Sequence, residues 1–285
     1  MEGTSSGAGT PGSSSFVSRH QFLIFRLFSL AGLLPVGGYL VVHLLTNATI
    51  LNGTAAFQTQ VDRIHSLGRL LPLVEWTFIF IPLLFHAVVG WFIISGAVPN
   101  TSSYPYAGNI RYVLQRTTGI IAFFFILYHV LQLHHLGFGE FKPEHAASSA
   151  AQAIDRALWI QVVYAIGIVS CVFHFANGIW TAGITWGIWT SRAAQRRASY
   201  VVLIFGVLLG IVALSALTGM SRVDVPYARR VEDRMERAKK FIDGKPVDLS
   251  SPDLPTPDPS KVDETSQDSS QLKSGVAAAG QSRSK

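Results

Sequence analysis

The chain has 285 residues, of which 49% are hydrophobic and 14% charged, and its mean hydropathy is +0.34. This composition is too apolar for an ordinary soluble domain. The net charge of +6 is scattered, so the sequence predicts no nucleic-acid partner. It also holds no P-loop and no dinucleotide-binding glycine motif. The single cysteine, Cys171, excludes an internal disulfide, a cysteine-ligated iron–sulfur cluster and a CxxCH motif.

The chain begins with residues 1–18, which are rich in glycine, serine and threonine and are predicted to be disordered. They lack the basic start and small-residue cleavage site of a secretory signal, so we expect the first hydrophobic segment to remain in the protein.

Residues 19–221 contain five hydrophobic segments that meet or approach the ~20 residues needed to cross a bilayer as a helix. They are Phe22–Thr46, Pro72–Ala97, Tyr112–His135, Leu158–Trp189 and Ser199–Met220. The fourth is long enough that it must tilt or project beyond the membrane. The sequence therefore predicts an all-α membrane protein, a bundle of five transmembrane helices.

The connections between these segments indicate the orientation, because arginine and lysine are enriched on the cytoplasmic side. With the N-terminus inside, the inner side carries Arg19, Arg26, Arg111, Arg116, Arg192, Arg196 and Arg197. The outer side then carries Arg63, Arg69, Lys142 and Arg156. We therefore expect a cytoplasmic N-terminus. Residues 222–285 form a charged tail, predicted to be largely disordered after a short surface helix.

Four histidines lie inside the first four hydrophobic segments, one in each: His43, His86, His129 and His174. Ionisable residues within a membrane are costly and usually functional. A rise of ~1.5 Å per residue places His43 and His129 roughly 5–6 Å from the outer surface, and His86 and His174 roughly 21–24 Å from it. We call His43 and His129 the outer pair, and His86 and His174 the inner pair. The pairing does not depend on the orientation.

Two imidazoles from different helices at the same depth are what bis-histidine ligation of a haem requires, and this arrangement occurs twice. The sequence therefore predicts two haems b, enclosed by the bundle, with these four histidines as iron ligands. The alternative is that they are buried histidines, hydrogen-bonded at helix interfaces. His20, His65 and His145 are predicted to lie outside the membrane on the surface, and His134 and His135 at its interface.

Haem propionates need donors, and the inner ends of two segments offer them. Arg26 and Ser29 share one helical face, and Gln115 and Arg116 begin the third segment. The alternative for the arginines is that they extend to the lipid headgroups. Glycines within the segments fit either close helix packing or space for a flat macrocycle.

Glu75 is the one carboxylate inside a predicted span, near its outer end. It precedes His86 by almost three helical turns, so it is expected to share that histidine's face. It is a candidate for proton exchange with a quinone, and the alternative is an acid at headgroup level.

The chain resembles the di-haem cytochrome b membrane anchors of succinate:quinone oxidoreductases, of the five-helix type. The resemblance covers roughly residues 22–220 and is most specific in the words LQRTTG and HFANG. The longer matching stretches are FRLFSLAGLLPVGGYLVVHLL, EWTFIFIPLLFHAVVGW, LQRTTGIIAFFFILYHV and VFHFANGIW. The terminal extensions depart from the family's compact pattern.

This resemblance implies a bacterial inner-membrane complex with a flavoprotein subunit and an iron–sulfur subunit on the cytoplasmic face. Electrons from succinate would reach the inner haem, then the outer haem, and then a quinone, which in this type is often menaquinone. The chain would hold no succinate-oxidising site of its own. Two alternatives stay open: a di-haem cytochrome b of another membrane oxidoreductase, and a multi-pass transporter with a histidine proton relay.

Overall fold

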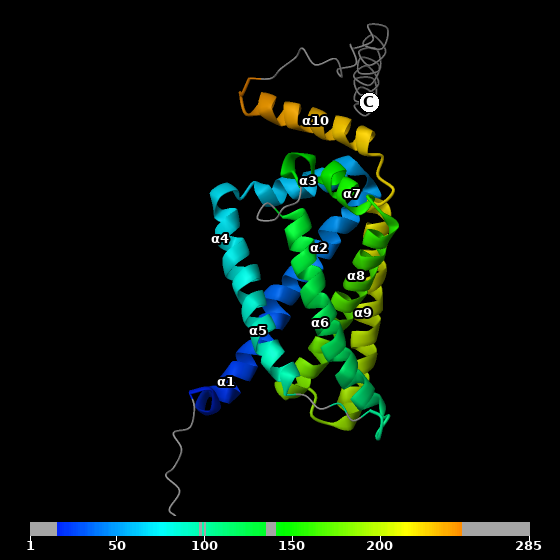
Figure 1. The fold of residues 1–285 in the computed structure, drawn as a ribbon. Helices are drawn as coiled ribbons and strands as arrows, with labels where there is room; N and C mark the ends of the chain where they lie inside the picture. The colour runs from blue at the N-terminus through cyan, green and yellow to red at the C-terminus, as the bar shows by residue number, and fades with distance from the viewer. Residues whose placement is uncertain (1–15, 97–98, 100, 135–140, 247–285) are drawn as a thin grey trace, which may run out of the picture. The chain divides into compact units, whose positions relative to one another are not determined.

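The structure, a computed structural model, describes residues 16–96, 99, 101–134 and 141–246. The chain divides into two units, Met1–Asp233 and Arg234–Lys285. All regular secondary structure in the described residues is helical, and five helical spans are long and apolar enough to cross a membrane (Figure 1). They are Arg19–Asn52, Gly68–Ser95, Ala107–Leu133, Leu158–Thr185 and Arg192–Met220. The predicted all-α fold with five spans is confirmed.

The first two spans are each interrupted by a π-helical turn. The first consists of α1 (Phe16–Ala31), η1 (Gly32–Val36), α2 (Gly37–Ala48) and η2 (Thr49–Asn52). The second consists of η3 (Gly68–Leu70), α4 (Leu71–Glu75), η4 (Trp76–Phe80) and α5 (Ile81–Ser95). Pro35 lies in η1 and Pro82 follows η4. A proline lacks the N–H that continues the α-helical ladder, which accounts for an interruption at both places.

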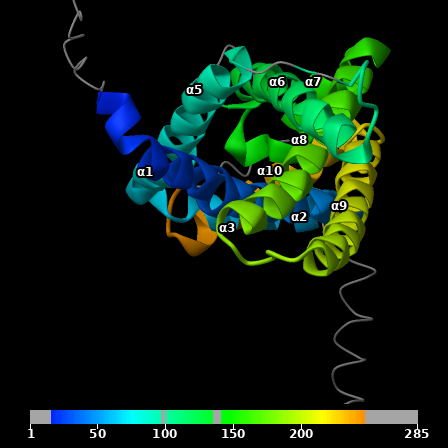
Figure 2. The same cartoon turned by 90° about the horizontal axis from the view of Figure 1, so that it is seen from below.

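The other three spans are continuous helices: α6 (Ala107–Leu133), α8 (Leu158–Thr185) and α9 (Arg192–Met220). Helix α8 packs against both α6 and α9, α9 packs against α2, and α5 packs against α1 and η1 (Figure 2). The most hydrophobic stretch of the second span has no buried residue. The second span is therefore the least tightly packed, although it carries His86.

Several boundaries differ from the predicted ones by a few residues, and two of the differences have a clear local cause. Helix α8 ends at Thr185 rather than Trp189, because the chain turns at Gly187, whose φ is 72°. Helix α9 begins at Arg192 rather than Ser199, after the Ser191 side chain accepts a hydrogen bond from the Ala194 N–H as an N-cap. The intervening arginines belong to the first turns of the helix.

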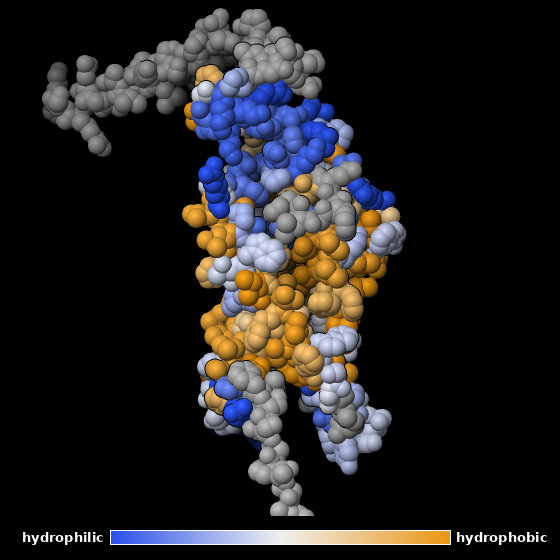
Figure 3. All heavy atoms as spheres, turned by 60° about the vertical axis from the view of Figure 1, so that its left-hand side comes forward, coloured by the Kyte–Doolittle hydropathy of each residue, from blue (hydrophilic) through white to orange (hydrophobic). Residues whose placement is uncertain are grey.

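Hydrophobic side chains form a belt around the middle of the face drawn in Figure 3, with hydrophilic residues at both ends. Large apolar side chains of the spans are exposed, among them Leu84, Leu203 and Leu208. Such exposure is unfavourable in water and favourable in hydrocarbon. The chain is a multi-pass membrane protein.

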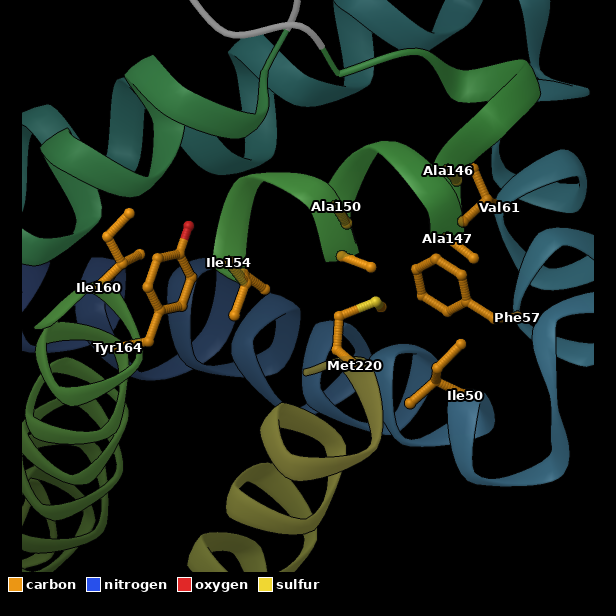
Figure 4. Close-up of a cluster of buried hydrophobic side chains, with 11 residues drawn as sticks. Ile50, Phe57, Val61, Ala146, Ala147, Ala150, Ile154, Ile160, Tyr164 and Met220 are labelled. Carbon is orange, nitrogen blue, oxygen red and sulfur yellow. The ribbon is translucent and has the colours of Figure 1, made fainter. Parts of the chain in front are cut away.

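Shorter helices connect and follow the spans. They are α3 (Thr54–His65), η5 (Pro143–His145), α7 (Ala146–Ile154) and α10 (Val225–Ile242). Helix α7 consists mainly of alanine and serine and is almost wholly buried, so it packs closely against α3. Their apolar faces join the ends of α8 and α9 in one cluster, which includes Phe57, Ile154, Tyr164 and Met220 (Figure 4).

Two buried polar side chains cap the N-terminus of α7 from other parts of the chain. Gln58 accepts a hydrogen bond from the Ala146 N–H at 3.0 Å. Glu232, in α10, accepts from the Ala147 and Ser148 N–H groups at 2.7 and 3.1 Å. These N–H groups have no partner within their own helix, so the two side chains satisfy them.

The terminal segments are partly described. Of the predicted disordered residues 1–18, those from Phe16 begin α1, and residues 1–15 lie outside the described residues. The predicted surface helix of the tail is α10, and residues 247–285 lie outside the described residues. His145 was expected on the surface, but its ring is partly buried, with Nε2 2.7 Å from the Asp233 carboxylate.

Candidate functional site

The four intramembrane histidines lie in two pairs. His43 on α2 and His129 on α6 have ring centres 5.7 Å apart, with planes at 78°. His86 on α5 and His174 on α8 have ring centres 6.1 Å apart, with planes at 83°. The outer pair and the inner pair expected from depth are therefore each in contact.

This spacing fits one metal ion between the rings of each pair. A metal–imidazole bond is about 2 Å long, so two imidazole nitrogens on opposite sides of an ion lie about 4 Å apart and their ring centres about 6 Å apart. The distances of 5.7 and 6.1 Å agree with that geometry.

The inner histidines are oriented by the main chain. The Nδ1 atoms of His86 and His174 lie 3.0 Å from the carbonyl oxygens of Phe28 and Gln115. A carbonyl only accepts, so each Nδ1 carries the proton and donates it, and each Nε2 is left with a free lone pair. This is the tautomer that a metal-binding histidine needs.

The sequence motifs LQRTTG and HFANG contact each other around His174. The Gln115 side chain donates to the His174 carbonyl oxygen at 3.1 Å and accepts from the Asn177 amide at 2.6 Å. Arg111 donates to Asn177, and also to the Ser199 hydroxyl at 3.0 Å. Asn177 is only 3% exposed. The network links α6, α8 and α9 and holds the inner end of the bundle in place.

Two glycines allow the inner histidines to approach neighbouring helices. A Cβ atom added at Gly32 would lie 2.4 Å from His86 Cε1, and one added at Gly119 would lie 2.8 Å from His174 Cε1. Non-bonded carbon atoms normally remain about 3.5–4.0 Å apart. Any larger residue at either position would displace the histidine.

The outer histidines have a different environment. His129 Nδ1 lies 3.4 Å from the Tyr164 hydroxyl, and that hydroxyl donates to Gln132 Oε1 at 2.7 Å. His43 contacts the Tyr39 ring at 5.5 Å between ring centres, and its carbonyl accepts from the Asn47 amide.

Two cavities adjoin the histidine pairs. One, of about 350 Å³, contacts all four histidines and extends to Tyr39, Asn47 and Glu75 at the outer end. The other, of about 890 Å³, adjoins the inner pair and is lined by Ser29, Gln115, Arg116 and both close-approach glycines. Their walls are mostly apolar, as is typical of cofactor pockets. The glycines, the histidine tautomers and the cavities together fit a flat, apolar, iron-containing group.

The four predicted propionate partners have different surroundings. Arg116 lines the larger cavity and its buried Nε has no hydrogen-bond partner among the described residues, so it retains a donor for an anion. Ser29 also lines this cavity and accepts weakly from Trp186 at 3.4 Å. The Arg26 guanidinium stacks on Phe22 and Trp186. Both polar atoms of the Gln115 side-chain amide are already hydrogen-bonded, the nitrogen to His174 and the oxygen to Asn177.

Glu75 lies at the outer end of the smaller cavity, partly buried. Its Oε2 is 3.7 Å from Nε2 of His134, whose ring packs edge-on against Phe80 at 5.4 Å between centres. The sequence predicts an interfacial His134, and the structure places it beside this carboxylate. His135, predicted to be interfacial as well, lies outside the described residues.

Sequence reasoning also missed Asn177, Gln132 and Tyr164. All three are polar residues within hydrophobic spans, where a polar side chain must find a partner. Gln132 follows His129 by three residues and therefore lies on the same helical face. That signal was available in the sequence.

Comparison with known proteins shows the family. A profile described as "Succinate dehydrogenase/Fumarate reductase transmembrane subunit" matches residues 98–213. The succinate dehydrogenase cytochrome b558 subunit of Bacillus subtilis (strain 168) is 36% identical over 197 residues, which cover 69% of this chain and 96% of that protein. The two alternatives left open by the sequence are therefore set aside. The chain belongs to the succinate dehydrogenase/fumarate reductase family, as a transmembrane cytochrome b subunit of that enzyme complex.

Proposed function

We propose that this subunit carries electrons from the iron–sulfur subunit of succinate dehydrogenase to a membrane quinone, menaquinone, through two haems b. The observation that supports two haems is the presence of two histidine pairs, each at a ring spacing of about 6 Å expected for a shared ion. Bound at these pairs, the haems would supply one-electron carriers at two depths of the membrane.

His86 and His174 would ligate the inner haem, and His43 and His129 the outer haem. The protein contributes by fixing ring orientation and by excluding water around the iron. Arg116, whose buried Nε has no hydrogen-bond partner in the part of the chain that the structure describes, is the best-supported propionate partner. Arg26 and Ser29 lie at the same end of the bundle. We assign Gln115 to the orientation of His174, because both ends of its amide are already bonded.

Quinone reduction requires protons as well as electrons. Glu75 borders the cavity that contains the outer pair, and it lies beside His134. We propose that the Glu75 carboxyl group delivers a proton to quinone at the outer end, which is the role expected of a positioned general acid.

The partners follow from the family. The flavoprotein and iron–sulfur subunits would dock at the inner end, where the short connections and span ends carry seven arginines, against three arginines and one lysine in those of the outer end. The N-terminus would be cytoplasmic in a bacterial inner membrane.

The test is purification of the intact complex from membranes, followed by a pyridine haemochrome assay and an optical redox titration. We expect two haems b for each copy of this subunit and two resolved midpoint potentials. A single haem, or none, would contradict the proposal. A matching assay of the complex without this subunit gives the background from the partners.

A further inference from the structure

We propose that Tyr164 is the positioning residue of the outer haem ligand His129, and that it lowers the midpoint potential of the outer haem. This inference rests on the proposed function, because it takes His129 to be a ligand. It concerns a side chain that is not itself a ligand and that lies ten residues before His174 on the same helix.

Three hydrogen bonds connect Ala153, Gln132, Tyr164 and His129. The direction of the first is unambiguous, and it determines the direction of the other two. The Gln132 amide nitrogen lies 3.1 Å from the Ala153 carbonyl oxygen, and a carbonyl only accepts, so the amide Oε1 must face Tyr164. The Tyr164 hydroxyl then donates its proton to Oε1 at 2.7 Å. Its oxygen is left as an acceptor facing His129 Nδ1 at 3.4 Å.

His129 is therefore held with its proton on Nδ1 and its lone pair on Nε2. That is the tautomer required for iron ligation, reached here through a side chain rather than through a main-chain carbonyl. A second ring contact fixes the plane of the imidazole: Phe125 stacks on His129 at 5.8 Å and 29°.

The hydroxyl is rigidly placed. Tyr164 is 3% exposed and lies between Ile160 and Ile154 in the cluster beneath α7 (Figure 4). Gln132 is anchored on the last turns of α7, at Ala153. The buried ring and the bond to Gln132 together keep the Tyr164 oxygen directed at His129 Nδ1.

The sign of the effect follows from ligand basicity. A histidine that donates its Nδ1–H becomes a stronger electron donor at Nε2, and a stronger donor stabilises the oxidised iron more than the reduced iron. The outer haem should therefore be harder to reduce with Tyr164 present than without it.

The experiment is a redox titration of the intact complex carrying Tyr164→Phe, which removes the hydroxyl and keeps the ring. The matched control is Tyr128→Phe, because the Tyr128 ring packs against Tyr164 at 6.2 Å and makes no hydrogen bond among the described residues. We expect the midpoint potential of the outer haem to rise in Tyr164→Phe only, with the inner haem unchanged. The low-spin electron paramagnetic resonance signal of the outer haem should shift as well, because the plane of the His129 imidazole loses a restraint.

Loss of the outer haem alone would also support the proposal. Unchanged outer potential and signal, or equal shifts at both haems, would overturn it. If Tyr164→Phe does not assemble, Gln132→Met decides by the same criteria, since it frees the hydroxyl from its fixed direction. Failure of the proposed function would give a different result from failure of this inference. The unaltered complex would then contain fewer than two haems, or His129→Ala would retain the outer haem.

Discussion

The inner and outer histidine pairs have nearly the same ring spacing but different supports. Both inner histidines donate to main-chain carbonyls of neighbouring helices at 3.0 Å, and both pack against glycines. In the outer pair, His129 meets a tyrosine hydroxyl at 3.4 Å. The position of a main-chain carbonyl is set by the helix that carries it, whereas a side-chain acceptor can be changed by one substitution. The support of the inner pair is therefore fixed by the fold, and the support of the outer pair can be changed by substitution. We refer to each pair together with its supporting groups as the inner level and the outer level.

The largest effect that tests this comparison is removal of a ligand. His86→Ala or His174→Ala should abolish the inner haem, and His43→Ala or His129→Ala the outer haem, because a single imidazole does not form a bis-histidine site. Optical redox titration of membranes measures which component disappears. His65→Ala, outside the spans, is the control that should retain both components. Equal loss of both haems from every variant would contradict the pairing.

A second prediction concerns only the outer end. Glu75→Gln keeps the size of the side chain but cannot give up a proton, so quinone reduction should slow by about 100-fold or more. Both haem spectra should persist. Quinone reductase activity at fixed succinate measures the effect, and Glu144→Gln, an exposed residue, is the matched control. Normal turnover in Glu75→Gln would remove this carboxyl group from the mechanism.

A third prediction concerns only the inner level. Gly32→Ala would place a methyl group 2.4 Å from His86 Cε1, so the ring must move out of line with His174. Changes in the groups that orient a metal-ligating histidine typically weaken metal binding by about 10–100-fold. Gly38→Ala is the matched control in the same span, since a Cβ there contacts nothing within 4 Å. The ratio of inner to outer haem absorbance after purification should fall in Gly32→Ala alone.

The parts of the fold that could be predicted from the sequence are those governed by short-range periodicity. Five spans, and the pairing of His43 with His129 and of His86 with His174, follow from hydropathy and the helical rise alone. The supports of the histidines do not, because they depend on which helix faces which. The Phe28 carbonyl that orients His86 has no signature in the sequence, since every residue has a carbonyl group.

Glu232 shows the same limit outside the spans. In the sequence it stands in a charged stretch that indicates a solvated helix, yet it is 0% exposed and bonded to two N–H groups of α7. Its partners lie 84 and 85 residues away, a separation at which local patterns carry no information. His145, at the N-cap position of α7, makes no capping hydrogen bond with its side chain. This was the only sign that a capping group must come from elsewhere in the chain.

The smallest predicted effect arises at this cap. Glu232→Ala should destabilise α7 by about 1–3 kcal/mol, because two buried N–H groups lose their acceptor. Glu232→Gln keeps one oxygen and should lose less. Hydrogen exchange at the Ala147 and Ser148 amides of the intact complex measures the change, and Glu236→Ala, which removes a surface pair with Lys240, is the control.

This last variant also tests the comparison between the two levels. Helix α7 reaches His129 through Ala153, Gln132 and Tyr164, whereas the inner histidines are bonded to α1 and α6. Loosening α7 should therefore disturb the outer haem's potential before the inner one's. If both potentials move together in Glu232→Ala, the outer level is as firmly built into the bundle as the inner level, and the distinction between them fails.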